Sequence, residues 1–220
     1  MSTLRIGRDA LIYSIPAILP RAIALVLIPY YTRVLSPAEY GAFDLIVVAS
    51  ALLAIIVSLE VSQGVARDYG SAGAKERDAI SGSSIQFVMV VGAVSVLAVW
   101  LLPPQWIATF LTDPLRPIHA RLAVLQATGI SLFTLTHNQL RWGLRAKDYA
   151  RVSVLHAVVT AGASVLLVTV MEDKLTALLS GLILGSVAGI SSSLVLLRPL
   201  RTWRWSRSVL QRMLAFSAPL

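Results

Sequence analysis

The sequence contains no cysteine and few charged residues. Cysteine is absent from all 220 positions, and Asp, Glu, Lys and Arg together make up only 14% of them. Without cysteine the chain has no disulfide bond, no catalytic thiol and no cysteine-ligated metal. A soluble domain carries about 25% charged residues, so the shortage of charge argues against a soluble protein. The 56% of hydrophobic residues argue the same way.

Sequence motifs of known chemistries are absent as well. The chain has no P-loop, no glycine-rich dinucleotide motif, no zinc-protease helix and no nucleophile elbow, each of which sets reactive groups at a defined spacing. Its histidines, His119, His137 and His156, are too far apart to ligate one metal from one helix. We therefore expect a protein that is not an enzyme and has no cofactor or metal. A proton or sodium gradient is left as the candidate energy source.

The chain consists largely of long apolar segments. About 20 apolar residues in a helix cross the roughly 30 Å hydrocarbon layer of a membrane. The first segment is longer than the apolar core of a secretory signal peptide, so we expect it to stay in the protein. The predicted fold is an all-α, polytopic membrane protein, one six-helix lobe over residues 1–220. Its spanning helices are expected over residues 10–32, 42–62, 83–102, 120–140, 152–171 and 175–197.

Basic residues predict the orientation of this lobe, because short loops rich in Lys and Arg stay in the cytoplasm. With a cytoplasmic N-terminus, most of the 19 Lys and Arg residues fall in cytoplasmic segments. Residues 66–78 are predicted to form a solvated cytoplasmic loop, and residues 198–215 a basic linker along the anionic inner leaflet. Membrane lipids therefore explain the net charge of +8 without nucleic acid. Residues 216–220 are expected to begin a truncated seventh helix.

Arg21 is the charge that most needs an explanation, because it interrupts the first apolar segment. An arginine keeps its proton, and at the bilayer centre it costs from about 3 to more than about 10 kcal/mol, so it usually faces protein or a watery cavity. Pro16, Pro20 and Pro29 predict a kinked or broken helix around it. Arg21 is therefore predicted to bind an anion inside the bundle. The alternative is a structural role, in which it bonds carbonyls that the prolines leave free.

Two carboxylates of the second expected helix are candidates for ion coupling. Asp44 lies near the outer end of segment 42–62, where it either stabilises the first helical turn or takes part in transport. Glu60 lies near the inner end of the same segment, where it either pairs with Arg67 or takes up a proton when desolvated. Both alternatives stay open for each residue.

The later helices add polar candidates and one packing pattern. Gln126 and His137 in segment 120–140, and His156 in segment 152–171, either bond neighbouring helices or line a cavity, and the histidines could handle protons. Segment 175–197 has a small residue at every fourth position, which lets a partner helix approach closely in lipid. The members of this stripe are Ala177, Gly181, Gly185, Gly189 and Ser193.

Four segments resemble one family of membrane proteins. They are LPRAIALVLIPYYTRVLSPAEYGAFDL at residues 19–45, VSLEVSQGVARDYG at 57–70, NQLRWGLRAKDYARVSVL at 138–155 and LAFSAPL at 214–220. These segments are similar to the Wzx-type oligosaccharide flippases of bacterial polysaccharide biosynthesis. That family belongs to the superfamily that also holds the MATE drug exporters and the lipid II flippase.

The resemblance implies a fold, a substrate and partners. The chain would be the N-terminal lobe of a two-lobed transporter, and a missing C-terminal lobe or a second copy would complete a cavity that opens alternately to each side. The substrate would be an oligosaccharide linked to polyprenyl diphosphate, moved from the cytoplasmic to the outer leaflet of the bacterial inner membrane. A polysaccharide polymerase and glycosyltransferases would be further partners. Arg21 is similar in place to a basic residue of the lipid II flippase and would bind the diphosphate.

Two other functions stay open on the sequence alone. A MATE-like antiporter of drugs would need unpaired carboxylates in its cavity rather than an arginine. A six-helix scaffold or assembly subunit that transports nothing would use the glycine stripe of segment 175–197 to associate with another protein.

Overall fold

The computed structural model describes residues 3–197 and 204–217, and within these ranges every regular element is a helix. Five of the helices, α2, α4, α6, α7 and α8, are long and apolar enough to cross a membrane. The predicted all-α class and the multi-pass membrane character are therefore confirmed. The helices are α1 (Thr3–Val34), α2 (Pro37–Ser58), α3 (Val61–Tyr69), α4 (Ala74–Leu101), α5 (Pro104–Ala108), α6 (Pro117–Trp142), α7 (Ala146–Val170), α8 (Lys174–Leu197) and α9 (Arg207–Ser217).

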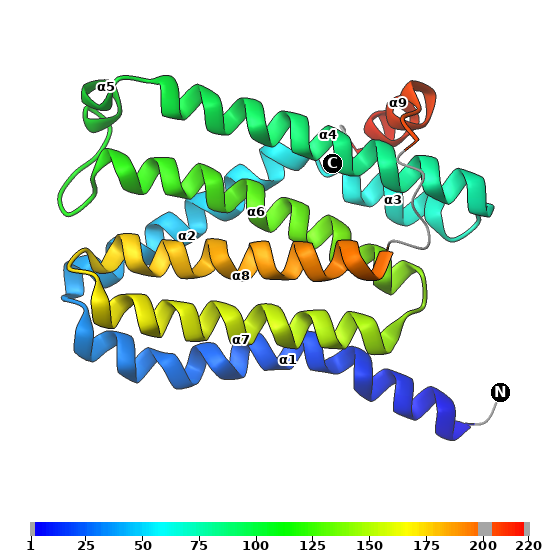
Figure 1. Ribbon diagram of the computed structural model, residues 1–220, viewed down its shortest axis with the longest axis horizontal. Helices are drawn as coiled ribbons and strands as arrows, with labels where there is room; N and C mark the ends of the chain where they lie inside the picture. Colours follow the sequence, from blue (N-terminus) through cyan, green and yellow to red (C-terminus); the bar gives the residue numbers. More distant parts are fainter. Residues whose placement is uncertain (1–2, 198–203, 218–220) are drawn as a thin grey trace.

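Helix α6 is the centre of the bundle. Figure 1 shows α8, α7 and α1 following one another on one side of α6 and α4 on the other, with α2 crossing behind. Half of the most apolar stretch of α6 is buried, against 22% for α2 and for α4. The outer helices leave large apolar side chains exposed, among them Leu45, Val94 and Leu166. Such a surface is unfavourable in water and is covered by hydrocarbon in a bilayer.

The first expected span, 10–32, lies inside α1. Prolines at positions 16, 20 and 29 predict a kink or a break, and the structure keeps α1 continuous. Its N-terminal turns lean away from α7 (Figure 1). Most side chains before Ile18 lie outside the described residues, so the sixth crossing stays a prediction.

Helix α2 begins at Pro37 rather than at 42, because Ser36 and Glu39 cap its N-terminus. The Ser36 backbone N–H donates to the Glu39 carboxylate (2.8 Å), and the Glu39 N–H donates to the Ser36 hydroxyl (3.3 Å). This reciprocal pair satisfies two backbone donors that the start of a helix leaves free. The acidic residue of the first turn is therefore Glu39, and Asp44 lies one turn further along. The alternative in which Asp44 stabilises the first turn is therefore not what the structure contains.

The expected helix 42–62 is two helices in the structure. Helix α2 ends at Ser58, and Leu59 and Glu60 both adopt left-handed backbone conformations, with φ of 43° and 49°. Left-handed residues cannot continue a right-handed helix. Helix α3 then starts at Val61 in a new direction, and only residues 70–73 separate it from α4. Most of the predicted loop 66–78 is therefore helical.

The small-residue stripe of α8 packs within the chain. At Gly181 an added Cβ would stand 2.7 Å from the Ser164 Cα, and at Gly185 it would stand 3.1 Å from the Thr160 Cα. Both partners belong to α7, so α7 and α8 approach at backbone distance, as helices in lipid do when side chains are small. The buried members of the stripe are Ala177, Gly181, Gly185, Gly189 and Ser193.

The C-terminal helix begins earlier than expected. Helix α9 starts at Arg207, inside the predicted linker 198–215, and not at 216. It packs on α3, where an added Cβ at Gly64 would stand 2.8 Å from the Met213 Cα. Arg212 donates to Asp68 and to Glu76, each at 2.9 Å. The first part of the linker, 198–203, and the tail 218–220 lie outside the described residues.

Candidate functional site

A polar groove of about 510 Å³ lies between α2, α3 and α6. Its volume falls within the range of about 300–1,000 Å³ that is usual for small-molecule sites. Small side chains on α2, such as Ala51 and Ala54, leave the space open, and polar side chains of α6 reach into it. The polar lining residues are Ser50, Ser58, Glu60, Ser62, Gln63, Gln126, Ser131, Thr134 and Asn138.

Hydrogen bonds hold α2 and α6 together beside this groove. The Ser131 hydroxyl donates to the Ala54 carbonyl at 3.0 Å, and the Ser50 hydroxyl donates to the Ala123 carbonyl at 3.3 Å. Both are hydroxyl-to-backbone bonds between helices, which a low-dielectric setting strengthens. The groove therefore lies between helices with a fixed spacing.

Two predicted site residues meet in this groove. Glu60 is half-buried and is the only charged residue among those that line it. Its carboxylate accepts one long hydrogen bond, 3.4 Å from the Gln63 amide. Gln126 is 8% exposed, and its side-chain oxygen is buried with no hydrogen-bond partner among the described residues.

The alternative in which Glu60 pairs with Arg67 is not what the structure contains. The Arg67 Nε donates to Asp68 at 2.8 Å, and its guanidinium lies 4.5 Å from the centre of the Phe216 ring. Helix α3 has turned away from α2 at the left-handed pair, so the regular helical spacing between positions 60 and 67 no longer applies.

A second hollow, of about 300 Å³, lies between α1, α2, α7 and α8. Its α1 wall includes Pro20 and Ala24, and its α7 wall includes His156. Val47 and Leu182 line both this hollow and the polar groove. The two spaces therefore adjoin one another.

His137 and His156 belong to one stack of four rings. In order, the rings are those of Tyr149, His137, Phe133 and His156, and the successive centroid distances are 4.0, 5.0 and 4.1 Å. His137 also donates from Nε2 to the Tyr149 carbonyl at 2.8 Å. The stack joins α6 to α7, so His137 has the first of its two expected roles, contact with a neighbouring helix. Only His156 also reaches a hollow.

Arg21 is exposed and lines neither hollow. Helix α1 packs on α7 with the face that carries Ile23, Leu27 and Tyr31, and Arg21 points about 100° away from that face. Among the described side chains it has no hydrogen bond or ion pair. The described side chains of this bundle therefore do not enclose Arg21, and its predicted binding of an anion stays a prediction.

Asp44 is also exposed and lines neither hollow. Of the six predicted binding or coupling residues, the structure brings only Glu60 and Gln126 into one site.

A cluster around Asp173 at the end of the bundle escaped the sequence analysis. The Asp173 carboxylate accepts from His119 Nε2 (3.1 Å), from the Thr176 hydroxyl (2.7 Å) and from Arg116. His119 is 1% exposed, and its Nδ1 accepts the Arg116 backbone N–H at 3.1 Å. Burial raises the pKa of Asp173, and the hydrogen bonds from Thr176 and His119 lower it more, so the net pKa is below its usual value. The available signal was an aspartate three residues before a threonine at a helix start.

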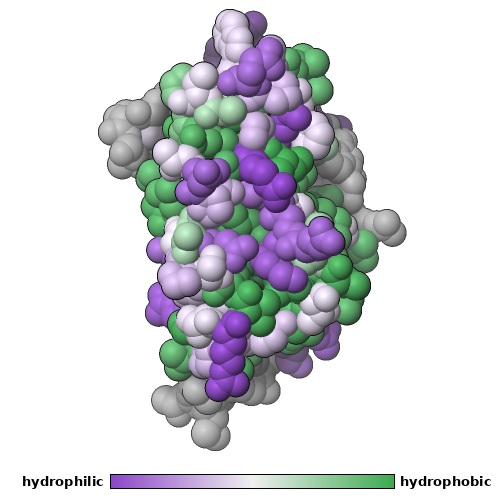
Figure 2. Space-filling model, turned by 90° about the vertical axis from the view of Figure 1, so that its left-hand side faces the viewer, coloured by the Kyte–Doolittle hydropathy of each residue, from purple (hydrophilic) through white to green (hydrophobic). Residues whose placement is uncertain are grey.

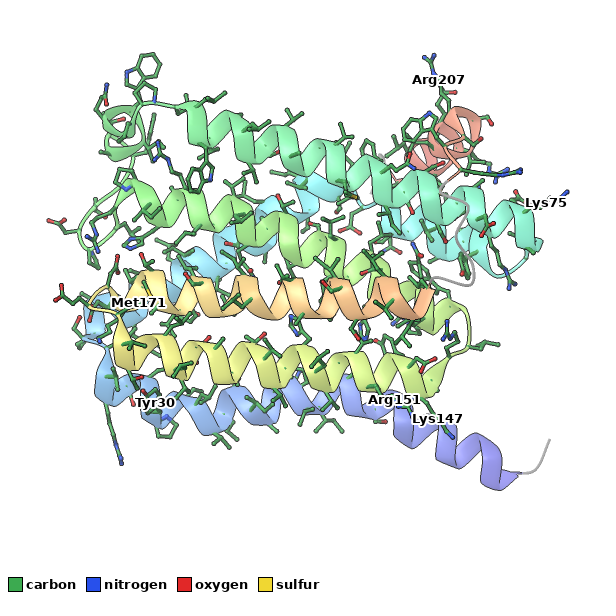
Figure 3. All side chains as sticks on the ribbon, in the orientation of Figure 1. Tyr30, Lys75, Lys147, Arg151, Met171 and Arg207 are labelled. Carbon is green, nitrogen blue, oxygen red and sulfur yellow. The ribbon has the colours of Figure 1, made fainter. Side chains whose placement is uncertain are left out.

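Three basic residues mark one end of the bundle (Figure 3). In Figure 3, Lys75, Lys147 and Arg207 lie at one end, and Tyr30 and Met171 lie at the other. Figure 2 looks onto the latter end and shows hydrophilic residues gathered over the helix connections, with hydrophobic residues along the margins. Polar ends on an apolar body are what a membrane-spanning bundle requires.

The family model described as polysaccharide biosynthesis protein matches residues 6–220. The chain belongs to this family. No match was found among curated proteins or among solved structures. Family membership and the apolar helices together establish a multi-pass membrane protein of polysaccharide biosynthesis.

Proposed function

We propose that this family member is a flippase that moves polyprenyl-diphosphate-linked oligosaccharide from the cytoplasmic to the outer leaflet of the bacterial inner membrane. The observation that carries the proposal is the family match over residues 6–220 in a chain with five membrane-spanning candidates. In this orientation the end with Lys75, Lys147 and Arg207 faces the cytoplasm, as the positive-inside rule requires (Figure 3).

The uncovered face of α1 supports a two-lobed, MATE-like assembly. Arg21 shares this exposed face with Ala24, Leu25 and Ile28. Arg21 lies 13 residues before Val34, which is about 20 Å along the helix and therefore within a hydrocarbon layer of about 30 Å. A charge at that depth requires cover. A C-terminal lobe, or a second copy, supplies it and closes a cavity in which Arg21 holds the diphosphate while the lobes rock.

Transport by this mechanism needs no chemical step and no cofactor in the chain. The expected absence of enzyme activity is part of the proposal, and a proton or sodium gradient drives the cycle. Asp44, His137 and His156 remain candidates for coupling. Glycosyltransferases that build the lipid-linked oligosaccharide and a polymerase that consumes it are the expected partners.

The test is Arg21→Ala, with flipping of the lipid-linked oligosaccharide measured in proteoliposomes. We expect the rate to fall about tenfold or more, because a charge-assisted contact to phosphate contributes about 1.5–3 kcal/mol. Arg21→Lys should recover part of the loss. Arg33→Ala removes an exposed charge from the last turn of the same helix and should change little. Full flipping by Arg21→Ala at normal protein level would rule out the diphosphate role.

A drug antiporter is the second candidate, and Glu60 in the groove is the observation that favours it. That function predicts competition between organic cations and protons at Glu60, with no effect of Arg21→Ala. The scaffold alternative loses its support, because the stripe at Gly181 and Gly185 is already covered by α7.

A further inference from the structure

The chemistry of the groove between α2, α3 and α6 is specific. Its polar lining consists of hydroxyl and amide side chains and one carboxylate, Glu60, with no basic and no aromatic side chain among the lining residues. A phosphate would meet no cation there. Among the described residues no group of three His, Asp or Glu could hold a metal ion. A neutral molecule with many hydroxyl groups fits this lining.

Gln126 supplies an amide group that the described part of the fold leaves unpaired. The residue is 8% exposed and lines the groove, and its side-chain oxygen has no hydrogen-bond partner in the described part of the chain. A buried polar atom without a partner destabilises a protein, so such atoms are rare and need a reason. That oxygen is enclosed by the protein, whereas the amide nitrogen of the same side chain is not among the enclosed atoms, so a ligand hydroxyl in the groove would accept a hydrogen bond from the nitrogen.

Glu60 supplies an acceptor. Its carboxylate receives only the long bond from Gln63, which leaves most of its acceptor capacity available. The left-handed conformation at Leu59 and Glu60 is uncommon for such residues, and strained backbone of this kind is concentrated at ligand sites. A carboxylate that accepts two neighbouring hydroxyl groups binds a sugar ring in one orientation.

The groove also adjoins the place proposed for the diphosphate. Val47 and Leu182 line both the groove and the hollow beside α1. On α1 that hollow is lined by Pro20 and Ala24, which flank Arg21 in sequence. A lipid-linked sugar with its diphosphate beside α1 would therefore have this groove as the neighbouring space for its glycan.

We propose that the groove between α2, α3 and α6 is the glycan subsite of the transporter, in which Glu60 accepts hydrogen bonds from hydroxyl groups of the sugar and the Gln126 amide nitrogen donates one. This inference rests on the proposed flippase function and adds to it the residues that recognise the sugar. Glu60 is then a substrate-binding residue and not a coupling residue.

The experiment measures equilibrium binding to the full-length chain in lipid nanodiscs, without any ion gradient. The probes are a lipid-linked oligosaccharide extracted from the producing bacterium, polyprenyl diphosphate without glycan, and the free oligosaccharide released from the first probe. The variants are Glu60→Gln and Gln126→Met, which preserve side-chain size. The controls are Glu172→Gln and Gln105→Met, which make the same changes at exposed positions outside the groove.

The expected result separates the sugar from the lipid. Each groove variant should weaken binding of the glycan-bearing lipid about tenfold, the effect of one hydrogen bond to a charged or buried group. Binding of polyprenyl diphosphate should stay unchanged, and the controls should match the native chain. Gln126→Met should also raise the melting temperature, because it removes an unpaired buried oxygen, and a merely structural role for Gln126 would instead lower it.

Two outcomes would overturn the inference. The first is unchanged affinity for the glycan-bearing lipid in both groove variants. This includes the case in which Glu60→Gln leaves binding intact and abolishes only gradient-driven transport, which is the behaviour of a coupling residue. Equal weakening for both lipids is the other. Failure of the proposed function looks different, because the native chain would then bind neither lipid, and retained binding of the free oligosaccharide would still support the subsite.

Discussion

Helices α7 and α8 meet without a gap, whereas α2 and α6 leave a groove between them, although both pairs carry small side chains where they face each other. On α8, Gly181 lies against the backbone of Ser164, so the small residues bring the two helices together. On α2, Ala51 and Ala54 face a space into which Gln126 reaches from α6. Small residues thus permit close approach, and the facing helix decides whether contact or a groove results.

The same contrast holds for polar groups. At the end of the bundle, the Asp173 carboxylate is bonded by Arg116, His119 and Thr176. In the groove, Gln126 has an unpaired oxygen and Glu60 one long bond. A satisfied polar cluster stabilises a fold, and an unsatisfied one in a groove is available to a ligand.

The largest effect on stability is expected from a substitution that breaks the α7–α8 contact. In Gly181→Ala the new Cβ would stand 2.7 Å from the Cα and N of Ser164, so the helix backbones must move apart. Overpacking of this kind costs about 1–3 kcal/mol. We expect a clear fall in the melting temperature of the detergent-solubilised protein, measured by its tryptophan fluorescence. Gly162→Ala on α7 is the matched control, since nothing lies within 4 Å of its Cβ. An equal fall in melting temperature for Gly181→Ala and Gly162→Ala would contradict the close packing of α7 on α8 at Gly181.

A smaller effect is expected at the satisfied polar cluster. The pKa of Asp173 is below its usual value in the folded protein, so its carboxylate stabilises the fold above about pH 4 and loses that effect as the pH falls through the folded pKa. Asp173→Asn should therefore lower stability by about 1–2 kcal/mol at pH 7. The difference from the native chain should shrink as the pH falls below about 4 and through the lowered pKa of Asp173, in melting curves recorded across this range. A difference that does not depend on pH would contradict the role of the charge.

The smallest effect on stability is expected in the groove itself. Ala51 is exposed and lines the groove, so Ala51→Leu places a larger side chain in open space. We expect the free energy of unfolding to change by no more than about 0.5 kcal/mol. Flipping should nevertheless fall sharply, because the side chain occupies the glycan subsite. Normal transport by Ala51→Leu would show that the substrate does not use this groove. The comparison with Gly181→Ala, where stability falls instead, separates the two kinds of helix pair.

The helical class and five of the long helices could be predicted from the sequence alone. Apolar segments of spanning length predict five of the helices. In hydrocarbon a backbone must satisfy its own hydrogen bonds, and a helix does so within one segment. The residues of the packing stripe are equally visible, since a period of four places them on one helix face. These features depend on local composition and spacing, which a sequence displays directly.

The tertiary structure decided which residues form a site. Glu60 and Gln126 are 66 positions apart, and only the packing of α2 on α6 brings them to one groove. The cluster at Asp173 also depends on contacts between distant segments, since His119 belongs to α6. Arg21 was conspicuous in the sequence, yet its exposure depends on which face of α1 meets α7. Helical periodicity gives the faces of each helix, and only the neighbouring helices determine which face is covered.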